Sequence, residues 1–301
     1  MSIIEKVLDK LEKDEPAKRN NKDSKSDKNT SSLLVQAEQL DKDEMASSTN
    51  NPVGKQNAVA PDIIKFDYER LKNLGILTPD TINITLSEQF RRIKMPILAN
   101  AYGNSMLETD SRNMIMVTSS LQNEGKSFTS FNLAMSIAKE FNHTVLYIDA
   151  DITQRTLENL LGVSARPGLV DYLLDGDRDL ARLLLKTDVP RLTLLPSGRA
   201  YDRVTELWSS QRMNALMDEL SSRYHDRVII FDAPPLLQDS SASILARLVG
   251  QVIIVVEAEK TPKHVVEEAV STLDGTQYVG LILNKSNQRA TSDYDYYYTS
   301  K

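Results

Sequence analysis

The sequence contains no cysteine, and this absence excludes several kinds of chemistry. Disulfide bonds, thiolate nucleophiles and cysteine metal sites are ruled out, and a reducing cytoplasm suits such a chain. Only three histidines occur, His143, His225 and His264, and their spacing matches no metal-binding motif. Basic residues are outnumbered, with 36 Lys and Arg against 42 Asp and Glu, so a general nucleic-acid binder is not expected.

Long apolar runs are also missing. The best of them, VIIVV at residues 252–256, has the length of a strand. It is shorter than the roughly 18–20 residues that cross a bilayer. The N-terminus has no apolar core of the kind that marks a signal peptide. We therefore expect a cytoplasmic protein that reaches a membrane only through a partner.

The first sixty residues differ in composition from the rest of the chain. Residues 1–14 place aliphatic side chains on one helical face and predict an amphipathic docking helix. Residues 15–60 are rich in Asn, Ser, Lys and Asp and predict a disordered linker. Residues 61–110 predict a helical lead-in, whose second helix is ITLSEQFRRIKMPILANAY.

Residues 111–290 alternate apolar, strand-like runs with amphipathic segments. The runs are MIMVTS, TVLYIDA, LTLLPSG, RVIIFDAPP, QVIIVVEA and YVGLILNK. Continuous apolar strands separated by helices form mostly parallel sheets that helices cover on both faces. We therefore expect an α/β fold whose ligands bind at the carboxyl ends of the strands.

The first run leads into SSLQNEGKS, which ends with the Gly-Lys-Ser of a phosphate-binding loop. Between a strand and an amphipathic helix, the backbone N–H groups of such a loop bind phosphate. Lys126 is expected to reach the terminal phosphates of ATP, and the Ser127 hydroxyl to bind Mg²⁺. Ser120 replaces the usual first glycine, and a simple strand–helix turn is the alternative interpretation. Six consecutive residues are expected to contact ATP: Asn123, Glu124, Gly125, Lys126, Ser127 and Phe128.

Acidic residues end two other strand-like runs. VLYIDAD places Asp149 and Asp151 at the end of one, and VIIFDAPP places Asp232 at the end of another, in the Walker B pattern. Each acid alone could cap a helix. Three acids beside a phosphate loop predict a metal–phosphate site, and hard oxygen ligands suit Mg²⁺. The motifs together predict a P-loop nucleotide triphosphatase or kinase.

The C-terminal tail, residues 291–301, carries a cluster of tyrosines. The tyrosines are Tyr294, Tyr296, Tyr297 and Tyr298. A segment that packs on its own domain and an edge strand are two structural interpretations. The neighbouring Asp293 and Asp295 disfavour a buried strand. The functional hypothesis is that these phenols accept phosphate.

Five features of the chain, in their order along it, resemble the bacterial tyrosine kinases, or BY-kinases. They are SSLQNEGKS, VLYIDAD, VIIFDAPP, GLILNK and the terminal tyrosines. That family lies within the MinD/ParA-like class of P-loop proteins with deviant Walker motifs. The resemblance covers roughly residues 62–301, and NLGILTPD and RRIKMPILANAY are most similar to exosortase-associated tyrosine autokinases. It implies a protein-tyrosine autokinase that uses ATP and Mg²⁺ and regulates exopolysaccharide or capsule synthesis and chain length.

The resemblance also implies roles for the matched residues. Lys126 and Ser127 would hold the phosphates and Mg²⁺. Asp149 would orient the incoming tyrosine hydroxyl or accept its proton. Asp151 and Asp232 would join Ser127 in the metal shell. These assignments make Lys126 and the three acids the expected catalytic set.

Further implications concern the base and the partners. Asn284 would contact adenine. SEQFRRIK resembles the oligomerisation helix of the family, with Glu88, Arg91 and Lys94 at the contact of a homo-oligomer for which a ring is one form. A Wzz-like membrane polysaccharide co-polymerase is the implied activator, which would recruit the kinase to the inner face of the membrane. No nucleic acid is implied.

Three residues depart from the family pattern. Gln122 stands where proline is usual, and Thr153 stands where arginine is usual, with Arg155 as a substitute two positions later. Lys94 replaces the third residue of the oligomerisation motif, and lysine lacks the bidentate fork of arginine.

Two other functions compete with the kinase. The first is a MinD/ParA-like ATPase that positions other proteins by a nucleotide switch, but such ATPases carry an extra lysine early in the loop. SSLQNEGKS has none, and the C-terminus is acidic instead of basic and amphipathic. The second is a scaffold that binds ATP without turnover.

Overall fold

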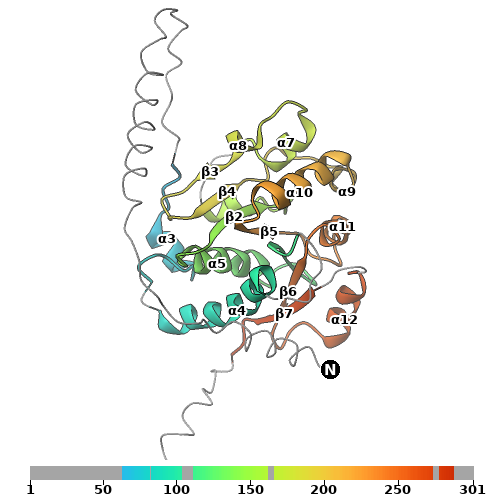
Figure 1. Ribbon diagram of the computed structural model, residues 1–301. Coiled ribbons are helices and arrows are strands. Elements are labelled where there is room, and N and C mark those ends of the chain that lie inside the picture. The colour runs from blue at the N-terminus through green and yellow to red at the C-terminus, as the bar shows by residue number, and fades with distance from the viewer. Residues whose placement is uncertain (1–62, 82, 104–110, 162–165, 274–277, 288–301) are drawn as a thin grey trace, which may run out of the picture. The chain divides into compact units, whose positions relative to one another are not determined.

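A computed structural model describes the chain from residue 63 to residue 287 with four gaps (Figure 1). The described ranges are 63–81, 83–103, 111–161, 166–273 and 278–287. The predicted docking helix, linker and tyrosine-rich tail lie outside them. No helix among the described ranges is long and apolar enough to cross a membrane.

A seven-stranded sheet with the order β3-β4-β2-β5-β1-β6-β7 forms the centre of the fold. Every neighbouring pair is parallel except β3 and β4. The α/β fold with a mostly parallel sheet is therefore confirmed. The strands are β1 (Met114–Ser119), β2 (Thr144–Asp149), β3 (Leu185–Lys186), β4 (Leu192–Leu195), β5 (Arg227–Asp232), β6 (Gln251–Glu257) and β7 (Tyr278–Asn284).

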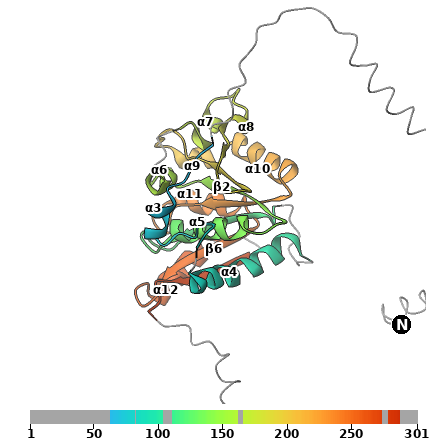
Figure 2. The same cartoon turned by 90° about the vertical axis from the view of Figure 1, so that its left-hand side faces the viewer.

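Helices cover both faces of this sheet, as Figures 1 and 2 show. One face is covered by α3 (Tyr68–Asn73), α4 (Ile84–Tyr102), α5 (Lys126–Ala138) and α6 (Thr156–Leu161). The other is covered by α7 (Leu169–Leu174), α8 (Leu180–Leu183), α9 (Val204–Trp208), α10 (Gln211–Arg223), α11 (Ser240–Ala246) and α12 (Lys263–Ser271).

The central strands are buried because each contributes side chains to both apolar layers. In β1, Met114 and Met116 pack in the layer under α7–α12, whereas Ile115 and Val117 pack in the layer under α3–α6. Successive side chains of a strand point to opposite faces, so a buried strand needs an unbroken apolar run. Burial of each such side chain contributes about 1.5–3 kcal/mol to stability. The strand ends that carry the predicted motifs are thus held on a rigid support.

The predicted helical lead-in is not helical throughout its described part. The segment before Gly75 is helical only in α3, because the Asp67 side chain accepts a hydrogen bond from the backbone N–H of Arg70 and starts the helix there. Gly75 has a φ of 74°, which turns the chain after α3. Upstream of α3, Ile64 forms a bridge with Thr187 beside the sheet. The second helix, α4, covers the predicted segment and is capped by Asn83, which accepts from Leu86 at 3.0 Å.

Candidate active site

The phosphate loop connects the carboxyl end of β1 to the N-terminus of α5. Gly125 caps α5 with a φ of 98°, and Asn123 has a φ of 65°. A Cβ atom at Gly125 would lie 2.0 Å from Asn284 Nδ2, so only glycine fits between the loop and the end of β7. This geometry presents backbone N–H groups at a helix N-terminus, where they bind phosphate.

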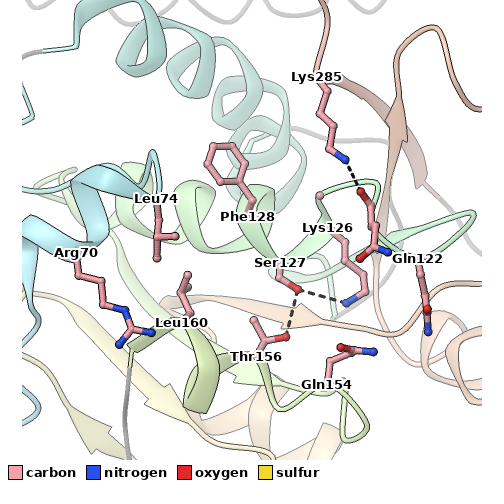
Figure 3. A pocket seen from close by; sticks show the side chains of 12 residues that line it. Arg70, Leu74, Gln122, Lys126, Ser127, Phe128, Gln154, Thr156, Leu160 and Lys285 are labelled. Carbon is pink, nitrogen blue, oxygen red and sulfur yellow. Dashed lines mark hydrogen bonds between the residues drawn. The ribbon is translucent and has the colours of Figure 1, made fainter.

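A cavity of about 590 Å³ opens in front of this loop (Figure 3). Its walls come from α3, the phosphate loop, the start of α5, the segment around α6 and the residue after β7. The lining residues are Arg70, Leu74, Gln122, Asn123, Gly125, Lys126, Ser127, Phe128, Gln154, Thr156, Leu160 and Lys285. The predicted Ser127 hydroxyl lies in the cavity wall, 3.2 Å from Thr156 Oγ1 and 3.3 Å from Lys126 Nζ.

Lys126 forms a buried ion pair with Asp151. Its Nζ atom lies 2.6 Å from Asp151 Oδ2, and the two side chains are 9% and 1% exposed. Asp151 Oδ1 accepts hydrogen bonds from the Thr153 hydroxyl at 2.9 Å and from the Gln154 N–H at 3.2 Å. Burial by itself would lower the pKa of Lys126, but the carboxylates of Asp232, Asp151 and Asp149 raise it above its usual value. Lys126 is therefore charged at neutral pH.

Asp149 and Asp232 lie side by side at the ends of β2 and β5. Asp149 Oδ2 accepts a hydrogen bond from the Leu157 N–H at 3.0 Å, while its Oδ1 is buried without a partner among the described residues. Burial, followed by the charge of Asp232, raises the pKa of Asp149 well above the usual value. Burial also raises the pKa of Asp232, against the opposing charge of Lys126.

These carboxylates fit a bound cation in one respect. Both oxygens of Asp232 are buried without a hydrogen-bond partner within the described ranges. Buried, unpaired carboxylate oxygens are costly, and a cation or its water ligands would satisfy them. No described group of three or more His, Cys, Asp or Glu side chains is arranged to hold a metal ion by itself. A cation here would therefore need phosphate oxygens or water as further ligands, as Mg²⁺ commonly has.

Glu124 supports the phosphate loop from behind. Its buried carboxylate accepts hydrogen bonds from the Leu121 N–H at 2.6 Å, the Glu257 N–H at 3.3 Å and the Thr261 hydroxyl. The Asn284 amide donates to the Glu124 carbonyl oxygen at 2.8 Å. The side chain of Glu124 is thus engaged by protein groups, and its expected contact with ATP would involve the backbone.

The three predicted oligomer residues occupy different environments along α4. Glu88 and Arg91 are exposed and form an ion pair with each other at 3.3 Å. Lys94 is buried, with Nζ 2.5 Å from Glu140 Oε1 and 3.1 Å from the Ser136 carbonyl oxygen. The charge of Lys94 is therefore used inside its own subunit, while Glu88 and Arg91 remain accessible. Contact with a second subunit stays a prediction for all three.

The residues that form the cavity wall opposite the phosphate loop were not predicted from the sequence. Arg70 lies in α3 and Leu74 directly follows it, while Thr156 and Leu160 lie in α6. Both helices are short, lie far from the loop in the sequence and carry no motif. Only the packing of α3 and α6 against α5 brings them to the cavity. The predicted acceptor tyrosines lie outside the described residues.

A phosphate loop after a central parallel strand, with acid-tipped strands beside it, defines a P-loop nucleotide-binding protein. Comparison with known proteins is consistent with this class and narrows it. Residues 113–296, more than half of the chain, match the family model described as AAA domain. The tyrosine-protein kinase CpsD of Streptococcus agalactiae is 31% identical over 201 residues, which are 65% of this chain and 86% of that protein.

Solved kinase domains have the same fold. The kinase domain of VpsO is 32% identical with a TM-score of 0.55, over 67% of this chain and 100% of that one. The kinase domain of the Escherichia coli tyrosine kinase ETK is 27% identical with a TM-score of 0.59, over 75% of this chain and 96% of that one. The chain belongs to the bacterial tyrosine-protein kinase family, which confirms the predicted resemblance.

Proposed function

We propose that this protein is an ATP-dependent tyrosine autokinase that phosphorylates the tyrosine cluster in its own C-terminal tail. The acceptors are Tyr294, Tyr296, Tyr297 and Tyr298. The observation that carries the proposal is the buried acidic edge beside the phosphate loop, where Asp151 pairs with Lys126 and the charges of Asp149 and Asp232 also act on it. Membership of the tyrosine-protein kinase family supports the choice of tyrosine as acceptor.

The proposed reaction forms a bond between a tyrosine oxygen and the γ-phosphorus of ATP and breaks the bond to the β–γ bridging oxygen, releasing ADP. A phenol has an ordinary pKa near 10, so its proton must leave as the new bond forms. The unpaired Oδ1 atom of Asp149 is the proposed acceptor of that proton. The raised pKa of Asp149 makes it a stronger base than an ordinary carboxylate.

In the proposed reaction, Lys126 binds the phosphates of ATP. Its charge is held at the pocket by Asp151, and an arriving phosphate would replace that carboxylate as its partner. Phosphoryl transfer has a loose transition state, so positioned positive charge does most of the work. Ser127, Asp151 and Asp232 are the residues that would hold Mg²⁺, which supplies further positive charge to the phosphates when bound.

The biological setting is also part of the proposal. The related kinases include CpsD of Streptococcus agalactiae and the putative tyrosine-protein kinase EpsB of Ralstonia nicotianae. For this chain we propose the setting that the sequence resemblance implies: a homo-oligomer, activated by a membrane polysaccharide co-polymerase, that regulates polymer synthesis and chain length. Recruitment to the inner face of the membrane would then depend on that partner.

Mass spectrometry after incubation with Mg-ATP tests the activity. We expect phosphate on tyrosines within residues 294–298, abolished by Lys126→Met and by replacing the four tyrosines with phenylalanine. Lys72→Met is the matched control, because Lys72 is an exposed lysine paired with Asp80 outside the cavity. ATP hydrolysis without phosphotyrosine in the wild type would contradict the kinase and favour a nucleotide-switched ATPase.

A further inference from the structure

The side chain of Glu124 joins the phosphate loop to the turn between β6 and α12. Glu124 is 2% exposed, and its two carboxylate oxygens have different partners. Oε2 accepts a hydrogen bond from the Leu121 N–H within the loop at 2.6 Å. Oε1 accepts from the Glu257 N–H at 3.3 Å and from the Thr261 hydroxyl. One buried carboxylate therefore closes the loop on itself and also fastens it to a turn far along the sequence.

Of the two groups that hold Oε1, the Thr261 hydroxyl makes the closer contact. The bond from the Glu257 N–H is longer than the common range of about 2.7–3.2 Å. The Thr261 backbone is itself held in place, because its N–H donates to the Glu257 carbonyl oxygen at 3.1 Å and the next residue, Pro262, caps α12. The turn thus presents the hydroxyl to Glu124 from a fixed position.

The backbone on both sides of this contact has uncommon dihedral angles. Asn123 and Gly125, which flank Glu124, have φ values of 65° and 98°. Glu259 in the turn and Lys285 after β7 have φ values of 61° and 57°. Residues other than glycine keep a positive φ where the surrounding structure holds them there. A loop with this backbone directs successive N–H groups towards an anion, so its shape depends on the groups that hold it.

Two further contacts reach the loop from the end of β7. The Asn284 amide donates to the Glu124 carbonyl oxygen at 2.8 Å and so holds the main chain alone. Lys285 Nζ donates to the Asn123 carbonyl oxygen and pairs with Glu257 Oε2 at 3.1 Å (Figure 3). The Lys285 side chain is 44% exposed, and exposed ion pairs contribute little. A hydrogen bond to a buried carboxylate contributes more, so the contact with the β6–α12 turn should dominate.

We propose that Thr261 is a positioning residue for ATP binding. Its hydroxyl acts through the carboxylate of Glu124 and sets the directions of the backbone N–H groups in residues 122–127, which face the phosphates. Thr261 is not among the described residues that line the cavity, so it touches neither ATP nor the reacting atoms. The inference rests on the ATP-binding part of the proposed function and concerns a residue outside every motif that the sequence predicts for the site.

Two measurements on the full chain test this role without phosphate transfer. They are the Kd of a fluorescent ATP analogue and amide hydrogen exchange in residues 121–127 of the nucleotide-free protein. Thr261→Val removes the hydroxyl and keeps the shape of the side chain. We expect it to weaken binding about tenfold, as for loss of one hydrogen bond to a charged group, and to speed exchange in the loop but not in β2. Thr261→Ser keeps the hydroxyl and should resemble the wild type in both measurements.

Thr272→Val is the matched control. The Thr272 hydroxyl donates to the Ala269 carbonyl oxygen at 2.7 Å at the other end of α12, outside the cavity, so its loss should change neither measurement. Unchanged ATP binding in Thr261→Val, weaker binding without faster exchange in the loop, or an equal loss in Thr261→Ser would overturn the proposal. Faster exchange in β2 as well would indicate a general loss of stability and would also overturn it. If the wild type forms no phosphotyrosine, the proposed kinase activity is refuted, whereas the expected changes in Thr261→Val would still support the positioning role.

Discussion

Asp149 lies at the end of β2 with one carboxylate oxygen buried and unpaired among the described residues. Burial and the neighbouring Asp232 raise its pKa well above the usual value. A carboxyl group whose pKa is higher in the folded than in the unfolded state makes its full contribution to the free energy of unfolding at low pH. It is lost as the pH rises through the folded-state pKa. The residue proposed as the base is thus a source of instability near neutral pH.

Asp149→Asn should therefore stabilise the protein and disable it. At pH 8 we expect the free energy of unfolding to increase by about 1–3 kcal/mol, since the cost of a buried carboxyl with a raised pKa is removed. The gain should be smaller at pH 5, because the destabilisation caused by a raised carboxyl pKa grows as the pH rises. Autophosphorylation should fall about 100-fold or more, as for loss of a general base.

Denaturant unfolding at the two pH values and phosphotyrosine initial rates measure these effects. Asp218→Asn is the matched control, because Asp218 is exposed on α10 and outside the cavity. It should change neither quantity. A stability gain of equal size at both pH values would show that the charge of Asp149 is not its cause.

At the scale of elements, Lys94 joins α4 to the C-terminal part of α5. Its ammonium group binds Glu140, whose pKa it lowers, and the carbonyl oxygen of Ser136 near the end of α5. Lysine cations near a helix C-terminus interact favourably with the last carbonyl groups. Lys94 is therefore expected to stabilise the packing of α4, whereas the exposed Arg91 is available to a second subunit.

Substitutions at these two positions should separate the roles. Lys94→Met keeps the apolar stem and should lower the free energy of unfolding by about 1 kcal/mol through loss of its hydrogen bonds. Arg91→Met should leave stability unchanged and reduce the mass of the assembly in light scattering. A reduced mass in Lys94→Met with unchanged stability would contradict this division.

The elements also show how far the sequence can predict the structure. The six long strands and α4 were predictable because each is an unbroken apolar run or a continuous amphipathic pattern. The two-residue β3 and the short α6, α7 and α8 were not, because segments of that length carry no periodicity. The phosphate loop and the three acids were predictable from motifs, whereas Arg70 and Leu160 reach the cavity only through packing. The burial of Lys94 was not predictable, because lysine is rarely buried unless it is paired, and only the packing of α4 shows that Glu140 is its partner.

For the whole molecule, the tail would change the charge balance. The chain has a net charge of -6, and phosphate on four tyrosines would add roughly -6 to -8. That charge would lie close to a pocket with buried carboxylates in every subunit. Under the proposed function, we expect self-phosphorylation to weaken the assembly.

Light scattering before and after incubation with Mg-ATP tests this expectation. The wild type should shift to a smaller mass as phosphotyrosine accumulates. Lys126→Met treated in the same way should keep its initial mass, since nucleotide alone should not dissociate it. A constant mass at high phosphotyrosine occupancy would refute the idea.

The hydrogen bond from Asn284 to the phosphate loop also limits where the tail can go. Tyr294 follows Asn284 by ten positions, and an extended chain spans at most about 3.6 Å per residue. The first acceptor is therefore tethered within about 36 Å of Asn284, whatever path the chain takes. The length of this tether therefore sets the local concentration of the acceptor tyrosines at the pocket. Lengthening the segment after β7 should lower that concentration without altering the pocket. Shortening it should favour acceptors supplied by a neighbouring subunit.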